Sequence, residues 1–153
     1  MHADAVDDAV DPNVCSQPDL PVAYFGFPGR VRDALVGAIL DGRKVSTTRL
    51  VADYEHGCEP LPHPGQRAVV VDSHDRPVAV IETTAVAPVQ LGEVDLAHVV
   101  DEGEGFTSLT EWRTAHETFW HSEEMRRALG DLAFTVNDAA PVLLERFRVV
   151  QVL

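Results

Sequence analysis

The sequence is poor in positive charge and in cysteine. Among its 153 residues, 12 lysines and arginines face 25 aspartates and glutamates, which gives a formal net charge of −13. Broad binding to duplex DNA depends on basic surfaces that displace counterions, so this charge balance argues against it. The two cysteines, Cys15 and Cys58, are better read as free thiols than as a structural disulfide, because a reducing compartment keeps thiols reduced.

Long apolar runs and a secretory leader are also missing. No stretch of about 18 apolar residues, the length that crosses a bilayer, occurs in the chain. Residues 1–20 contain five aspartates and no lysine or arginine, unlike the cationic start of a signal peptide. We therefore expect a cytoplasmic protein with no membrane partner. Its residues 1–20 are expected to form a disordered acidic tail, and its residues 21–153 a single domain.

The pattern of apolar and turn-forming residues predicts a mixture of helices and strands. Helices are predicted over 28–41, 93–100 and 108–129, the last with a capping box formed by Ser108 and Glu111. Strands are predicted over 45–51 and 142–153, and a hairpin over 67–72 and 78–86. A loop over 53–66 separates the first strand from the hairpin. These elements favour an α+β fold whose antiparallel strands curl into a small barrel flanked by helices.

Residues 42–49 concentrate positive charge and hydroxyl groups after the first predicted helix. One interpretation is a helix end neutralised by cations, and the other is a site for an anion or a nucleotide. Lys44 is the only lysine among the 12 basic residues, and lysine, unlike arginine, can lose its proton when it is buried. Lys44 and Thr47 cannot share one face of a regular strand, because side chains alternate with a period of two. Joint action of these two residues requires a turn or bulge between them.

Carboxylates form the second group of candidates. Glu102 and Glu104 alternate with glycines just before the helix at 108–129, where they are suited either to acid–base chemistry or to a solvated turn. Glu82 lies in a predicted buried strand and needs a partner, Lys44 or an arginine. Metal ligation and cofactors are not expected, because the spacing of His56, Cys58 and His63 matches no known site. Aromatic residues at helical spacing around Trp112, together with His116, are expected in the core.

Several short motifs, taken in order, resemble the ASCH-domain family over about residues 25–119. They are Gly42-Arg43-Lys44 with Ser46-Thr47, Tyr54-Glu55, Glu59-Pro60-Leu61-Pro62 with Gly65, Ile81-Glu82-Thr83-Thr84, and Glu102-Gly103-Glu104-Gly105 with Ser108-Leu109-Thr110-Glu111-Trp112-Arg113. The resemblance implies a PUA-like fold, a small antiparallel β-barrel flanked by helices. It also implies a cleft that receives a nucleoside or single-stranded RNA.

The resemblance further implies an activity and the residues that perform it. Some bacterial members are described as amidohydrolases that remove the acyl group of N4-acetylcytidine with a lysine, a threonine and a glutamate. These roles fall on Lys44, Thr47 and Glu104, with Glu102 as the other possible glutamate. Residues expected to contact the substrate are Arg43, Ser46, Thr48, Arg49, Tyr54, Glu82 and Glu102. The alternatives are a metal-independent ribonuclease that uses the same cleft and an RNA-binding module without catalysis.

The protonation state of Lys44 separates these functions. As a neutral amine it would serve as a base on Thr47 or attack an acyl carbon itself, with Glu104 assisting the leaving amine. As an ammonium it would stabilise an oxyanion or a phosphate, which suits RNA cleavage or simple binding.

Overall fold

A single five-stranded sheet organises the chain. The computed structural model describes residues 20–153, so the predictions for residues 1–19, Cys15 included, lie outside the described residues. The strands are β1 (Val22–Ala23), β2 (Ser46–Leu50), β3 (Arg67–Val71), β4 (Pro77–Gln90) and β5 (Pro141–Val152), in the order β1-β3-β4-β5-β2. All neighbouring strands are antiparallel except the parallel pair β1–β3. The predicted α+β class is confirmed.

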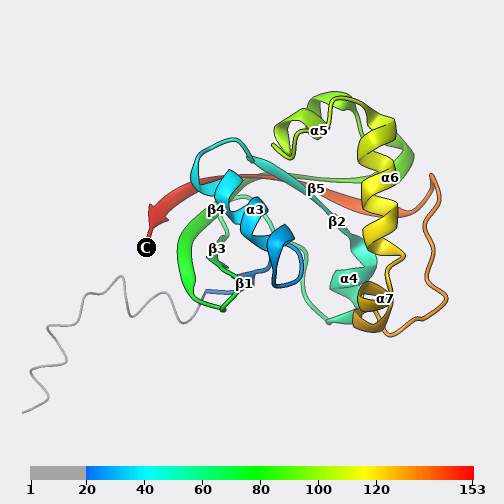
Figure 1. Cartoon of the computed structure of the whole chain (residues 1–153), viewed down its shortest axis with the longest axis horizontal. Coiled ribbons are helices and arrows are strands. Elements are labelled where there is room, and N and C mark those ends of the chain that lie inside the picture. Colours follow the sequence, from blue (N-terminus) through cyan, green and yellow to red (C-terminus); the bar gives the residue numbers. More distant parts are fainter. Residues whose placement is uncertain (1–19) are drawn as a thin grey trace, which may run out of the picture.

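The sheet is strongly bent but does not close into a complete barrel. β1 and β2 are its two edges, and Figure 1 shows the long strands β4 and β5 curving together across the molecule. Two register shifts between these strands, at Val80/Ile81 and Thr83/Ala85, supply extra residues that bend a sheet. The curvature therefore follows from irregularities inside the longest strand pair, and a short β1 leaves the barrel open.

Five α-helices accompany the sheet in residues 20–153. They are α3 (Arg30–Leu40), α4 (Val51–His56), α5 (Leu96–Asp101), α6 (Leu109–Trp120) and α7 (Glu123–Ala128), with a 3-10 turn η2 at Leu91–Glu93. Two predictions need correction. The expected loop over 53–66 begins inside α4, and the expected helix over 108–129 is two helices. The second break occurs because the Ser122 hydroxyl accepts a hydrogen bond from the Met125 amide and so caps a new helix.

Two apolar clusters pack on opposite faces of the sheet. One contains Phe25, Val36, Ile39 and Phe147 and lies under α3; the other contains Trp112, Trp120, Leu50 and Val142 and lies under α5, α6 and α7. Val142 and Phe147 belong to different clusters because side chains alternate along β5. Figure 1 shows α3 apart from the group formed by α5, α6 and α7. No helix in the described part of the chain is long and apolar enough to cross a membrane.

Candidate functional site

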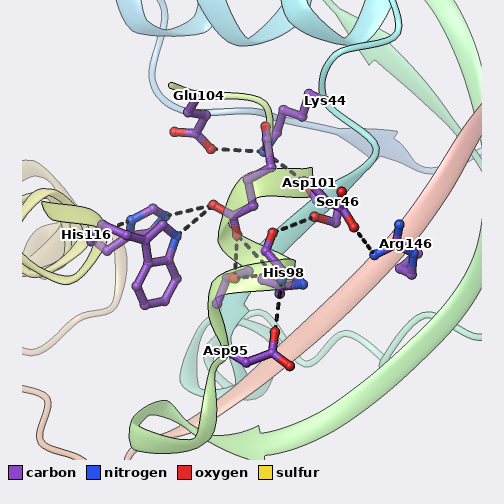
Figure 2. A network of polar contacts seen from close by, with 11 residues as sticks. Lys44, Ser46, Asp95, His98, Asp101, Glu104, His116 and Arg146 are labelled. Atoms are coloured by element: carbon purple, nitrogen blue, oxygen red, sulfur yellow. Dashed lines mark hydrogen bonds and ion pairs between the residues drawn. The ribbon is translucent and has the colours of Figure 1, made fainter. Parts of the chain in front are cut away.

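Lys44 lies at the junction of α3 and β2, and its side chain turns into the protein. Its amide donates to the Ala38 carbonyl at the end of α3, while its side chain is only 1% exposed. The Nζ atom donates to Ser46 O at 2.9 Å, Glu102 O at 3.3 Å and Glu104 Oε2 at 3.0 Å (Figure 2). Three acceptors require the three hydrogens of an ammonium. Lys44 is therefore charged here and has no lone pair with which to act as a base.

Glu102 lies beneath this ammonium at the end of α5 and is completely buried. Its Oε1 accepts from Trp112 Nε1 at 2.8 Å, and its Oε2 accepts from the Thr48 hydroxyl at 2.5 Å and from His98 Nε2 at 3.0 Å. Burial raises the pKa of this carboxyl. The His98 hydrogen bond, the Lys44 charge, His116 and Thr48 outweigh burial and lower the pKa to about 2. Glu102 is thus a buried carboxylate.

Gly103 allows the acidic loop to touch the lysine segment backbone to backbone. It adopts a φ of +67°, and a Cβ atom built on it would lie 2.3 Å from Arg43 O and 2.6 Å from Lys44 N. No residue with a side chain fits such an approach. Gly105, with a φ of +90°, follows Glu104. The glycines of the Glu-Gly-Glu-Gly segment therefore place Glu102 below the ammonium and Glu104 beside it.

Two hydroxyls of β2 complete the inner layer of this cluster. Ser46 is fully buried and donates to the His98 carbonyl at 3.3 Å. The Thr48 hydroxyl, besides donating to Glu102, lies 2.8 Å from His98 Nε2, from which it accepts. Three residues expected to contact a substrate thus have partners inside the protein: Thr48 donates to Glu102, and Ser46 donates to α5. The carbonyls of Ser46 and Glu102 also position the Lys44 amine.

The structure brings Lys44 and Glu104 together, but it places Thr47 on the other face of β2. Ser46, Thr48 and Leu50 are buried, and Thr47 and Arg49 between them are half-buried, the alternation of a regular strand. No bulge is present in β2 to bring Thr47 toward Lys44. The hydroxyls on the Lys44 side of β2 are therefore those of Ser46 and Thr48.

Thr47 belongs with a second group of polar side chains. It is paired with Glu145 of β5, and the neighbouring Arg49 guanidinium bonds Asp53 at 2.7 Å and lies over the ring of Tyr54 at 4.7 Å. The hydroxyl of Thr83 donates to Glu145 at 2.5 Å. Burial raises the pKa of Glu145, against the opposing effects of the Thr83 hydrogen bond and the Arg49 charge. Arg49 and Tyr54, both expected to contact a substrate, thus lie together in this second group of polar side chains.

Sequence reasoning missed Glu145, Thr83 and His98 as members of these groups. In the closing strand, Glu145 lies between apolar residues that face the core. A charged residue in such a position was the available signal of a polar contact. The i,i+4 spacing of His98 and Glu102 was the available signal for their contact. The contact of His98 with Thr48 had no such signal, because it joins α5 to β2 across 50 residues.

Two other predicted substrate contacts lie at the surface. Arg43 is exposed and pairs with Asp41 at 2.9 Å. Glu82 pairs with Arg67 at 3.3 Å and Arg148 at 2.7 Å, a cross-strand arrangement on β3, β4 and β5. The partner of Glu82 is therefore arginine, one of the two expected choices. Neither residue contacts Lys44 or Glu104 among the bonds of residues 20–153.

The surface is hollowed next to Lys44. A hollow of about 300 Å³ is lined by Lys44 and by mostly apolar neighbours, among them Leu40, Val45, Phe147 and Val149. Small-molecule pockets have volumes of this order. Another hollow of about 340 Å³, lined by residues such as Ala52 and Phe134, shares no residue with the first. Of the two hollows, only the first has a residue of the charged cluster, Lys44, in its lining.

One prediction follows from the burial of Tyr54. Burial raises the pKa of its phenol to about 12; the Arg49 charge opposes this shift, and Glu145, Asp53 and Glu59 add to it. A raised pKa stabilises the fold below the ordinary value of about 10, and this stabilisation disappears as the pH rises from about 10 to 12. We expect an alkaline absorbance titration to contain a phenolate component near pH 12 that Tyr54→Phe abolishes. Loss of a component near pH 10 instead would contradict the environment described.

Potential metal ligands gather in one place within residues 20–153. Glu102, Glu104 and His116 each offer an atom within 4.8 Å of the others. The histidines and cysteine near residue 60 form no such group in the described part of the chain.

Comparisons with known proteins agree with the fold. A family model described as the ASCH domain matches residues 22–151. The crystal structure of an ASCH domain from Lactobacillus crispatus JV V101 is 26% identical, with a TM-score of 0.73 over 97% of this chain and 91% of that one. The crystal structure of a protein from Enterococcus faecalis V583 is 23% identical, with a TM-score of 0.76 over 92% and 85% of the two chains. No curated protein sequence matches the chain.

Proposed function

The chain belongs to the ASCH-domain family, and from this premise we propose that it hydrolyses the acyl group of an N4-acylcytidine-like nucleoside at the Lys44–Glu104 pair. The observation that carries the proposal is the 3.0 Å contact between a buried ammonium and a partly exposed carboxylate. Lys44 is also among the residues that line a hollow of about 300 Å³. The acyl group and the base are expected to occupy that hollow.

Substrate binding would activate both members of the pair by separating them. Of the three acceptors around Lys44 Nζ, two are backbone carbonyls and one is the Glu104 side chain. Glu104 is followed by Gly105, where a Cβ atom would meet nothing within 4 Å, so the backbone after Glu104 has room to move. A carbonyl oxygen of the substrate that takes the place of Glu104 receives the freed N–H of Lys44. The released carboxylate is then able to take a proton.

An ammonium at Lys44, expected to suit RNA cleavage or binding, also fits acyl hydrolysis when Glu104 and not Lys44 is the base, so the roles assigned by resemblance change. The ionised Glu104 removes a proton from water, the resulting hydroxide adds to the acyl carbon, and the Lys44 ammonium stabilises the oxyanion. As the carbon–nitrogen bond breaks, Glu104 returns the proton to the leaving amine, so that a carboxylic acid and the free exocyclic amine are formed. Lys44 donates hydrogen bonds throughout and need not lose a proton. Thr47 has no step in this scheme, because β2 turns it away from the pair.

The test is turnover of N4-acetylcytidine by the purified full chain, with Glu104→Gln as the informative variant. Glutamine keeps the shape and can accept a hydrogen bond from Lys44, but it cannot carry a proton, so kcat should fall by about 100-fold or more. Glu124→Gln, an exposed glutamate in the first turn of α7, is the matched control and should keep full activity. Thr47→Val should keep most activity, whereas Thr47 as nucleophile predicts its complete loss.

A second function is favoured by the fact that Lys44 Nζ already has three hydrogen-bond acceptors within the protein. If Lys44 never releases Glu104, the cluster only supports a surface that binds single-stranded RNA, with exposed arginines such as Arg67 and Arg148 meeting phosphates. Binding of a labelled RNA without turnover of either the RNA or the nucleoside would favour this function. Cleavage of RNA that Glu104→Gln abolishes would assign the same pair to a ribonuclease.

A further inference from the structure

His116 presents one ring nitrogen to the two glutamates without a hydrogen bond to either. Its Nδ1 lies 2.9 Å from the Trp112 carbonyl, which can only accept, so Nδ1 carries the hydrogen. The ring stacks on the Trp112 indole with centroids 4.3 Å apart, and this fixes its direction. In the neutral imidazole the lone pair is therefore on Nε2. That atom lies 3.5 Å from Glu102 Oε1, too far for a good hydrogen bond.

A lone pair that faces carboxylate oxygens is unfavourable unless a positive charge lies between them. The cluster contains the carboxylates of Glu102 and Glu104 and the amine of Lys44, which bonds Glu104 at 3.0 Å. His98 donates from Nε2 to Glu102 and Thr48 and needs no second proton to do so. His116 Nε2 therefore faces the position between the carboxylates of Glu102 and Glu104.

We propose that this position binds a divalent transition-metal ion, with zinc as its best representative, between His116 Nε2, Glu102 and Glu104. The three ligand atoms lie within 4.8 Å of one another, whereas tetrahedral ligands with bonds of about 2.0–2.2 Å lie about 3.3–3.6 Å apart. An ion would therefore draw the three side chains slightly closer together. An imidazole nitrogen with two carboxylates is a zinc or manganese donor set and suits magnesium poorly. Three protein ligands leave a fourth position for water.

The buried surroundings support the ligands as they do in metal sites. The Trp112 carbonyl orients His116, and hydrogen bonds from Trp112 Nε1, Thr48 and His98 hold the Glu102 carboxylate. Figure 2 shows His116 and Glu104 directed toward the same region, with Lys44 on its far side. Such supporting contacts fix the direction of each ligand before the ion arrives. Ion binding is measurable without turnover, so this proposal and the hydrolase proposal can fail separately.

The experiment is calorimetric titration of zinc chloride into the metal-free full chain at neutral pH. Because thiols also bind zinc, it is performed in a variant with Cys15→Ser and Cys58→Ser. We expect one ion to bind per chain. The affinity for zinc should be at least tenfold weaker in His116→Gln and in Glu104→Gln. It should be unchanged in the control His74→Gln, which alters an exposed histidine in the β3–β4 turn. Magnesium chloride should produce no comparable binding.

Two results would overturn the proposal. One is the absence of binding in the cysteine-free protein together with a His116 ring that carries hydrogen on both nitrogens in NMR spectra, since a proton would then lie between the ring and the carboxylates. The other is zinc binding of equal strength in His116→Gln, Glu104→Gln and the control, which would place the ion elsewhere. Melting curves without metal establish that each variant is folded. Should His116→Gln fail to fold, Glu104→Gln decides, because that side chain is 20% exposed.

Discussion

Replacing Gly103 by alanine is expected to cost about 3 kcal/mol or more of folding stability and to separate Glu104 from Lys44. The residue has a φ of +67°, which costs an L-residue about 1–2 kcal/mol. In addition, the new methyl group would lie 2.3 Å from Arg43 O, so backbone must move, and overpacking of this kind costs typically about 1–3 kcal/mol. Urea unfolding of Gly103→Ala beside the native chain measures the loss.

Gly105→Ala is the matched control for this substitution. Gly105 also has a positive φ, +90°, but a Cβ atom there would meet nothing within 4 Å. Only the conformational cost of about 1–2 kcal/mol applies. The difference between the two variants therefore measures the close approach of the acidic loop to the lysine segment. Equal destabilisation by both would contradict that contact.

Removing the Glu102 carboxylate is the second substitution with a large expected effect. Glu102→Gln leaves the shape but loses the charge that opposes Lys44, and its amide NH₂ must face at least one of the donors Trp112, Thr48 and His98. Breaking a buried charge pair on one side costs about 3–5 kcal/mol. We expect a loss of this size in denaturant unfolding, and less than about 0.5 kcal/mol for the exposed control Glu55→Gln.

The pH dependence of stability provides a second test of Glu102. Its pKa is lowered from the ordinary 4.5 to about 2 in the folded protein, so the unfolded state binds the proton more tightly. The resulting stabilisation, about 3 kcal/mol, is present above pH 4.5 and is lost as the pH falls toward 2. Subtracting the profile of Glu102→Gln from that of the native chain isolates this group from others, Glu145 among them. A flat difference between pH 5 and 2 would mean that the carboxyl is not held as a carboxylate.

The elements with strong local signals were predictable from the sequence. The β3–β4 hairpin, the strand β2, the closing strand β5 and the start of α6 follow from β-branched runs, turn residues and the Ser108 cap. The helix α4 and the division of the predicted 108–129 helix into α6 and α7 could not be predicted, because apolar periodicity does not show where a short helix begins or where a helix is interrupted. The apolar periodicity continues past His121 and so gives no sign that the helix ends there. The helix is interrupted because Ser122 caps α7.

The candidate site was predictable in its main pair and not in its details. Lys44 and Glu104 do meet, 60 residues apart in sequence. The hydroxyl beside them is not that of Thr47, because β2 is regular and one residue of shift reverses the face of a side chain. Glu102 and His116 acquire their roles from packing between α5 and α6, and that packing has no sequence signature. Sequence motifs identified the segments, and the fold decided which atoms face one another.

The charge state of Lys44 tests the account most directly, and the chain allows it to be observed alone. Lys44 is the sole lysine, so a protein labelled with ¹⁵N-lysine has a single side-chain nitrogen signal. At neutral pH we predict the ¹⁵N shift of an ammonium coupled to three hydrogens that exchange slowly with water, because each is bonded to Ser46 O, Glu102 O or Glu104. Glu104→Gln should shift this signal and speed the exchange. A neutral amine signal, or rapid exchange unaffected by Glu104→Gln, would contradict the charged pair on which the proposed function depends.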